Sequence, residues 1–176
     1  TRREGSRERQ GFYSSDMIYL IMSDRFVDGD ESNNTLKGMA EPANKDNVHG
    51  RFGGDIQGVI NSLDHISSLG ATAIWATPFL EDNEAAWSYH GYACSDYYHI
   101  DPRHGNNELY KQMVQKAHEK GIKIIFFAEG RKVEQFYEEA KYALKNGMLV
   151  GNHSYSHPGF SSLTLEEGIA DIEKCE

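Results

Sequence analysis

Apolar and polar positions along the chain predict strands that alternate with helices. Apolar runs of strand length recur four times, and Gly, Ser or Asp residues flank them. The predicted strands are residues 17–22, 71–79, 121–130 and 148–150. Between and after these runs, apolar residues follow a helical spacing. The predicted helices are residues 55–69, 107–120, 133–146 and 164–175.

The ends of these helices carry residues that commonly stop or start a helix. Gly70, Gly121 and Gly147 follow three of the predicted helices, and Gly is frequent just after a helix end. At the start of the last helix, Thr164 is followed three positions later by Glu167, which forms a capping box.

Alternating strands and helices are typical of βα units around a parallel sheet, so the sequence predicts the α/β class. About four such units make a partial TIM-barrel-like fold, a half-barrel. A half-barrel exposes sheet edges, and pairing of two copies through these edges into a homodimer is one expectation. Loops that follow the strands share one face, where we expect a ligand.

Composition narrows the classes of protein and partner. We expect one folded α/β domain over residues 11–176, after a flexible polar arm at residues 1–10. The formal net charge of −9 argues against nucleic acid as a partner. No apolar run is long enough to cross a bilayer, so no membrane partner is expected. The basic N-terminus is not followed by an apolar stretch, so no signal peptide is visible and the compartment stays undetermined.

Two long loops, at residues 27–52 and 81–99, interrupt the pattern, and loops of this length are usually functional. The first loop, with the Gly-Gly-Asp that follows it, is rich in oxygen donors. Ca²⁺ takes six to eight oxygen ligands from carboxylates, amides and backbone carbonyls. The candidate calcium ligands are Asp28, Asp30, Asn33, Asn34, Gly53 and Asp55. The alternative is ordinary turn chemistry of Asp and Asn side chains in a polar loop.

Five ordered motifs carry a resemblance to a known family. They are Asp-Arg-Phe-Val-Asp-Gly-Asp at 24–30, Gly-Gly-Asp-Ile-Gln-Gly at 53–58, Ala-Ile-Trp-Ala-Thr-Pro at 73–78, Tyr-His-Gly-Tyr at 89–92 and Asp-Tyr-Tyr-His-Ile-Asp at 96–101. Residues 11–125 thus resemble the N-terminal part of the α-amylase family, glycoside hydrolase family 13, above all its neopullulanase, cyclomaltodextrinase and glucanotransferase members. The resemblance implies a structural calcium on the candidate ligands above. It also implies an α-glucan partner, with Tyr92 stacking on a glucose ring and His90 bonding a hydroxyl group.

The same resemblance argues against an assigned catalytic residue. Retaining glycosidases need a carboxylate nucleophile and a carboxylic acid about 5 Å apart. The family places these on its fourth and fifth strands, with a third carboxylate on the seventh, and has an Asp…Asn-His motif after its third strand. This chain has Phe127 in place of that Asp and Arg131-Lys132 in place of Asn-His, and the later strands are absent. We therefore assign no catalytic residue.

A different chemistry is suggested by His153 and His157, four positions apart after the last predicted strand. Two His at this spacing can share one metal ion, although surface histidines are the alternative. The motif Gly-Asn-His-Ser-Tyr-Ser-His-Pro at 151–158 makes residues 126–176 resemble a polysaccharide deacetylase. In that family two His and an Asp hold zinc, and a second Asp acts as base. This chain lacks the family's Phe-Asp-Asp-Gly motif, and candidate replacement carboxylates are Asp24, Glu81, Asp82 and Glu129.

We interpret the chain as a chimera of two carbohydrate-enzyme segments that join in the strand at 121–130. Both parent families are often extracytoplasmic. The first functional hypothesis is a scaffold without efficient catalysis that binds calcium and weakly binds glucan. The second is a zinc-dependent, deacetylase-type hydrolase that uses His153 and His157. The third is a residual α-glucan hydrolase.

Overall fold

A computed structural model describes residues 13–175 of the chain. The described residues form two compact units, one of residues 17–123 and one of residues 124–175 with 13–16. The single domain expected over residues 11–176 stays a prediction, and the expected arm at residues 1–10 lies outside the described residues. Among the described residues no helix is both long enough and apolar enough to span a membrane.

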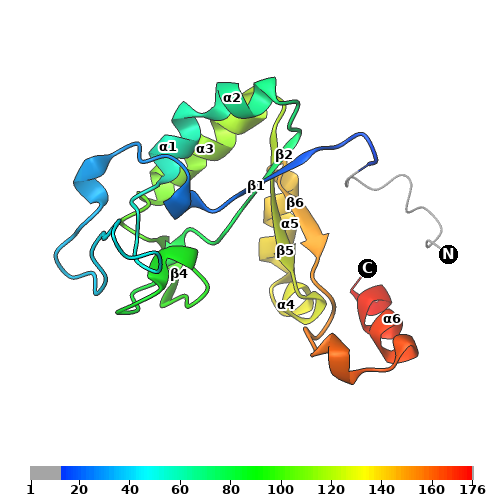
Figure 1. Ribbon diagram of the computed structural model, residues 1–176. Helices are drawn as coiled ribbons and strands as arrows, with labels where there is room; N and C mark the ends of the chain where they lie inside the picture. Colours follow the sequence, from blue (N-terminus) through cyan, green and yellow to red (C-terminus); the bar gives the residue numbers. More distant parts are fainter. Residues whose placement is uncertain (1–12, 176) are drawn as a thin grey trace. The chain divides into compact units, whose positions relative to one another are not determined.

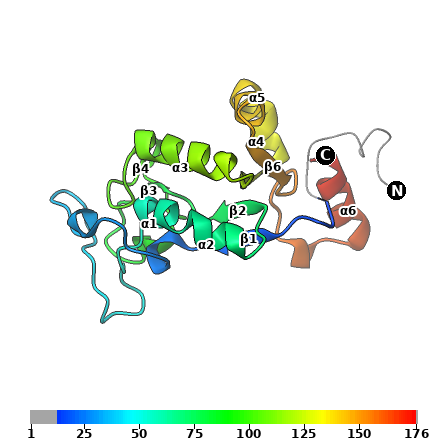
Figure 2. The same ribbon diagram turned by 90° about the horizontal axis from the view of Figure 1, so that it is seen from above.

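The unit of residues 17–123 is built on a parallel strand pair and a helical layer. β1 (Ile18–Ile21) pairs in parallel with β2 (Ala73–Ala76). Figures 1 and 2 both place α1 (Ile56–Asn61) and α2 (Leu63–Ser68) alongside α3 (Asn107–Glu119). The apolar faces of these elements meet in one core, where each buried Ile or Leu side chain contributes about 1.5–3 kcal/mol. Its members include Ile21, Ile56, Val59, Leu63, Ile66, Ile74, Met113, Ala117 and Ile122.

The helix predicted at residues 55–69 is divided into α1 and α2 at Ser62. The Ser62 hydroxyl donates to the Gly58 carbonyl at 2.8 Å, and Ser62 has φ −99° and ψ 0°. A serine that bonds back to the carbonyl four residues earlier competes with the helical ladder and bends the helix. The apolar spacing continues across the break, which explains why the sequence predicts one helix.

A small antiparallel ribbon forms from the two ends of the second predicted loop and the residues next to them. β3 (Leu80–Glu81) pairs with β4 (Asp96–Ile100), and the turn η3 (Ser88–His90) lies between them. The sequence predicts only a loop here, because a two-residue strand is too short to show an alternating pattern. Two further short helical turns, η1 (Ser23–Arg25) and η2 (Glu31–Asn33), follow β1.

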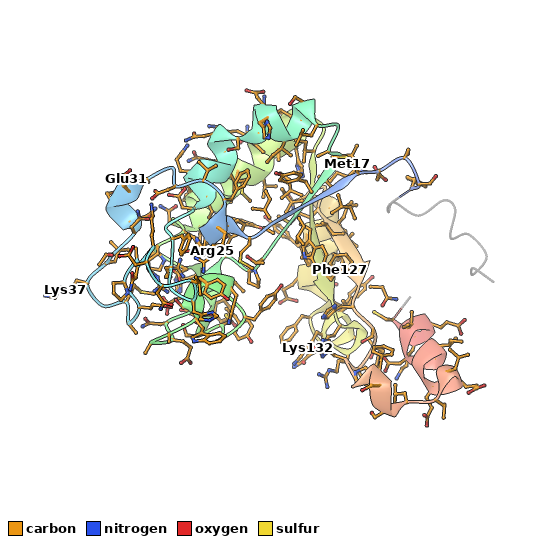
Figure 3. The ribbon with its side chains drawn as sticks, viewed as in Figure 1. Met17, Arg25, Glu31, Lys37, Phe127 and Lys132 are labelled. Carbon is orange, nitrogen blue, oxygen red and sulfur yellow. The ribbon has the colours of Figure 1, made fainter. Side chains whose placement is uncertain are left out.

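The other unit repeats the βα arrangement. β5 (Lys123–Ala128) pairs in parallel with β6 (Leu149–Asn152). The helix predicted at 133–146 begins earlier and is divided at Phe136 into α4 (Gly130–Gln135) and α5 (Tyr137–Lys145). Figure 3 labels Phe127 on β5 and Lys132 on α4.

The chain ends in η4 (Phe160–Ser162) and α6 (Leu165–Lys174). The capping box predicted from Thr164 and Glu167 is present at the start of α6. Parallel strand pairs that alternate with helices confirm the predicted α/β class.

Substitution by alanine should change the free energy of unfolding in opposite directions at two helical glycines. A Cβ on Gly58 in α1 would lie 1.8 Å from the Val27 carbonyl oxygen, so Gly58→Ala should lower the free energy of unfolding by about 1–3 kcal/mol. Gly168 in α6 is the matched control. Its Cβ would meet its nearest neighbour at 3.4 Å, so Gly168→Ala should raise stability by up to about 1 kcal/mol. Urea unfolding measures both, and equal effects would contradict the close contact at Gly58.

Candidate functional site

Two fully buried arginines hold the loops of residues 17–123 together. Arg103 donates from Nε and Nη2 to the two oxygens of Asp101, at 2.9 and 2.7 Å. Arg51 lies 3.8 Å from Asp24 and 4.0 Å from Asp101. All four side chains are at most 1% exposed, and buried charges are tolerated only when they are paired. Arg103 also donates to the carbonyls of residues 41 and 82, so it joins both long loops to β4.

The carboxylate of Asp24 positions the segment that leads into Gly-Gly-Asp. It accepts the backbone N–H of Phe52 at 2.9 Å and that of Gly53 at 3.2 Å. Burial raises the pKa of Asp24, and the N–H of Phe52 and the charge of Arg51 offset only part of this effect. At Asp101 burial also acts to raise the pKa, but the hydrogen bond from Arg103 and the charge of Arg51 outweigh it and hold the pKa below its usual value.

His104 completes this buried network as a neutral ring. Its Nδ1 lies 3.1 Å from the Gly54 carbonyl oxygen, and its Nε2 lies 3.3 Å from Nη2 of Arg51. A carbonyl only accepts and a guanidinium only donates, so the ring carries its proton on Nδ1. Burial, together with the charge of Arg51, lowers the pKa of His104 to about 3.

The turn η3, which carries the predicted sugar residue His90, is fixed to the same network. Ser88 donates from its N–H and its hydroxyl to Glu41 Oε2, both at 2.7 Å, and its carbonyl accepts from Arg51 at 3.1 Å. Gly91, with φ +78°, ends the turn in a place where a Cβ would lie 2.3 Å from the Pro78 carbonyl oxygen. Only glycine fits there.

The structure brings His90 and Tyr92 together at the surface. The N–H of Tyr92 donates to His90 Nδ1 at 2.6 Å, so His90 carries its proton on Nε2. The two rings lie 5.8 Å apart with an angle of 38° between their planes. Tyr92 is 67% exposed, so its ring is accessible to a ligand.

Arg25 stabilises the motif from the other side. Its guanidinium lies 3.9 Å from the ring centre of Phe52 and 4.2 Å from that of Tyr89, and its Nη2 donates to the Val48 carbonyl. Stacked guanidinium–aromatic contacts of this kind are favourable. Arg25 therefore connects Tyr89, the residue before His90, to the end of the first loop.

The predicted calcium ligands lie in one loop cluster but have different roles. Asp28 and Asn34 contact each other, with Asn34 Nδ2 donating to Asp28 Oδ2 at 2.7 Å. Gly53, with φ +95°, lies against the amide of Asn34, since a Cβ there would be 2.2 Å from Asn34 Oδ1. Asp30 turns away to cap η2 and accepts from Ser32.

Asp55 is the hub that closes this loop on α1. Its carboxylate accepts the N–H groups of Gly29, Asp30 and Gly58 and the side-chain amide of Asn33, at 2.6–3.1 Å. A carboxylate with four donors is already saturated. Asp55 thus organises the loop by its own hydrogen bonds.

Three oxygens of the cluster are buried without a hydrogen-bond partner: Asp28 Oδ1, Asn33 Oδ1 and Asn34 Oδ1. They make up half of the buried side-chain N and O atoms without a partner among the described residues. Each such group costs about 1–3 kcal/mol. Carboxylate and amide oxygens are the donors that Ca²⁺ uses, so these residues fit the ion. Over residues 13–175, no group of three His, Cys, Asp or Glu side chains is arranged for a metal, so amide and carbonyl oxygens would be essential.

His153 and His157 also lie together, with ring centres 4.7 Å apart. Asp171 of α6 holds the intervening loop by accepting the N–H groups of Tyr155 and Ser156. Glu129 is ion-paired with Arg131, and its pKa is lowered first by that hydrogen bond and also by the charge of His157. The described part of the chain arranges no third His, Cys, Asp or Glu ligand here, and zinc binding at this pair stays a prediction.

The sequence analysis missed the buried network. Arg51, Arg103, His104 and Glu41 were not singled out, because charged residues are normally exposed and nothing in a loop marks a buried one. The available signal was position: Arg51 precedes Phe-Gly-Gly-Asp and Arg103-His104 follows Asp101, both next to motifs that carry the resemblance.

Comparison with known proteins identifies the family. The model of the α-amylase catalytic domain matches residues 20–129, so the chain belongs to the α-amylase family. A model for polysaccharide deacetylase matches residues 98–176, and the two matches overlap over residues 98–129.

Individual relatives match most of this chain but only a small part of their own length. A cyclomaltodextrinase of Thermoanaerobacter pseudethanolicus is 40% identical over 64% of this chain and 19% of its own length. A cyclomaltodextrin glucanotransferase of Thermoanaerobacterium thermosulfurigenes is 33% identical over 89% of this chain and 25% of its own length. The crystal structure of an Anoxybacillus α-amylase is 32% identical over 67% of this chain and 25% of that chain, with a TM-score of 0.59. The chain thus spans a quarter or less of these three proteins.

The neutral state of His104 predicts a stability that depends on pH. Its pKa is about 3 in the folded chain and about 6.5 in the unfolded chain, so below pH 6.5 only the unfolded chain takes up this proton. The contribution of His104 therefore lowers the free energy of unfolding as the pH falls through this window, by up to roughly 1 kcal/mol per pH unit. Urea unfolding between about pH 6.5 and about pH 4.5 should show a shallower fall for His104→Asn than for the wild type.

His99 provides the matched control. A hydrogen bond with Asp96 raises the pKa of His99, so its stabilising contribution is present at low pH and is lost as the pH rises. Because this contribution is already complete below the unfolded pKa, His99→Asn should leave the fall below about pH 6.5 like that of the wild type and should change the pH dependence only above it, unlike His104→Asn. Identical slopes for the wild type and His104→Asn would contradict a neutral buried ring.

Proposed function

We propose that this chain is a calcium-stabilised, α-glucan-binding segment of the α-amylase family that has no efficient catalysis of its own. The relatives that support a glucan ligand are a cyclomaltodextrinase and a cyclomaltodextrin glucanotransferase. The matches to two family models support the interpretation of the chain as a fusion of an amylase-like and a deacetylase-like segment.

The observation that carries the calcium proposal is the set of three buried oxygens without partners on one loop. Asp28 Oδ1 and Asn34 Oδ1 belong to side chains that contact each other, and Gly53 lies against the Asn34 amide. A cation among these atoms would replace the missing hydrogen bonds and would tie the loop to the Gly-Gly-Asp segment. Asp28 would supply the negative charge.

The glucan proposal rests on His90 and Tyr92. The His90 ring presents an Nε2–H, and Tyr92 presents an exposed face beside it. His90 lies in the turn η3, and Tyr92 follows it; Glu41 and Arg51 fix this turn by hydrogen bonds to Ser88. A site whose geometry is set before binding loses less entropy when the ligand binds.

The proposal that the chain has no efficient catalysis rests on residues of β5 and α4. Phe127 and Arg131-Lys132 stand where the α-amylase family carries an Asp and an Asn-His pair. The nucleophile and the acid of retaining glycosidases lie on the family's fourth and fifth strands, and no residue of this chain is assigned to either role. The described residues therefore supply sugar contacts to this site without the catalytic groups expected beside them.

Calcium should raise the melting temperature of the wild type. At a Ca²⁺ concentration of about 100 times Kd, binding stabilises the folded state by about 3 kcal/mol, which corresponds to roughly 6–12 °C. Asp28→Asn preserves the shape of the side chain but removes its charge, so the shift should largely disappear. Thermal melts with CaCl₂ and with EGTA measure it.

Asp46→Asn is the matched control, because Asp46 is an exposed aspartate of the same loop outside the cluster. Its calcium-dependent shift should equal that of the wild type. A wild-type melting temperature that does not change with calcium would refute the calcium site.

Glucan binding should depend on Tyr92. Isothermal titration with maltoheptaose should give a Kd that rises by at least tenfold in Tyr92→Ala, since the stacking surface is lost. Tyr97→Ala is the control. Tyr97 on β4 is also well exposed, at 75%, but lies outside the Tyr-His-Gly-Tyr motif, so the Kd of this variant should equal that of the wild type. No heat of binding by the wild type at millimolar maltoheptaose would refute the proposal.

A further inference from the structure

Trp87, directly before η3, has a conformation that the functions described above do not explain. Its backbone is left-handed, with φ +68°, and its side chain is 53% exposed. A bulky residue with positive φ is a real outlier, because Cβ crowds the following carbonyl. Strained backbone of this kind persists only where neighbouring structure enforces it, and it is concentrated at ligand sites.

The neighbouring structure enforces the position of Trp87 from two sides. The next residue, Ser88, is held by Glu41 and Arg51 of the buried network. The ring of His49 stacks on the indole, with ring centres 4.4 Å apart and planes within 3° of parallel. The N–H of His49 donates to Asn47 Oδ1 at 3.0 Å, which fixes the tight turn that carries it.

His49 stacks on one face of the indole, and Trp87 is nevertheless 53% exposed, from which we infer that the opposite face is open to solvent. A flat aromatic face that is open to solvent, rigid and backed by a second ring is a stacking surface. In a chain of net charge −9 the surface suits a neutral ring-shaped ligand better than an anionic one.

A sugar is the ring-shaped ligand that the surroundings favour. Trp87 precedes His90 by three residues, and three residues of chain span at most about 10 Å. One oligosaccharide can therefore contact the indole face and the pair His90–Tyr92 at the same time.

We propose that Trp87, backed by His49, is a second sugar-stacking surface that binds the glucose unit next to the one held by His90 and Tyr92. The inference rests on the proposed glucan-binding function and extends it. It assigns a purpose to the strained backbone at Trp87, which directly precedes the turn that carries His90.

The test uses the fluorescence and calorimetry of the full chain. The sequence contains two tryptophans, Trp75 and Trp87, so Trp75→Phe leaves Trp87 as the only indole. Titration of Trp75→Phe with maltoheptaose should give a saturable change in indole emission. Calorimetry should show a Kd raised about tenfold in Trp87→Ala and by less in His49→Ala, whereas Trp87→Phe, which keeps a flat ring, should bind within about threefold of the wild type.

The outcomes separate this inference from the function on which it rests. If Tyr92→Ala loses binding but Trp87→Ala does not, the second surface is refuted and the glucan-binding function stands. If the wild type does not bind maltoheptaose, both are refuted. Equal losses in Trp87→Ala and Trp87→Phe would also refute stacking, because only the first removes the ring; thermal melts show that each variant is folded.

Discussion

The pairing of two buried arginines is the constraint on which the loops of residues 17–123 depend. Arg51 and Arg103 are each about 1% exposed, and an unpaired buried guanidinium would cost several kcal/mol. The partners that pair them come from distant parts of the chain: Asp24 follows β1, and Asp101 follows β4. Satisfying the arginines therefore fixes where these segments meet. This network makes loops without regular secondary structure rigid, and a binding site requires such rigidity.

The candidate sites are extensions of this network. Asp24 positions Phe52 and Gly53, which lead into the calcium cluster, and Arg51 positions Ser88, which leads into the sugar residues. The network thus connects both candidate sites to one buried centre. A residue that never contacts a ligand can still decide the geometry of both sites.

The sequence predicted the elements better than the roles of individual residues. All four parallel strands and the capping box at Thr164 were predicted, because apolar runs and helix caps have local signatures. The sequence did not predict the helix breaks at Ser62 and Phe136, because the apolar spacing continues across them. It also did not predict the ribbon of β3 and β4, because β3 is too short to show an alternating pattern. The calcium ligand set Asp28, Asp30, Asn33, Asn34, Gly53 and Asp55 was predicted from the oxygen donors of the loop and the family resemblance, and calcium binding there stays a prediction. That Asp55 is saturated by four donors was not predicted, since this depends on how the loop folds back on α1. The buried arginines were not predicted, because arginine is normally exposed and the available signal is their position next to the motifs.

Residues with a strained backbone occur in both units of the chain. Among residues 13–175, the residues other than glycine with positive φ are Trp87, Ser154 and His157. Each lies in or beside a motif that the sequence singled out for ligand binding, and residues next to each are held by hydrogen bonds from outside the turn or loop. Glu41 and Arg51 hold the residue after Trp87, while Asp171 holds the two residues between Ser154 and His157. Relaxing any of these residues to an ordinary conformation would be locally favourable, so the surrounding hydrogen bonds must be strong enough to prevent it. The hydrogen bonds from Asp171 therefore hold the loop of Ser154 and His157 in its strained conformation. Among the described residues, no third His, Cys, Asp or Glu ligand is arranged beside the two histidines of this loop.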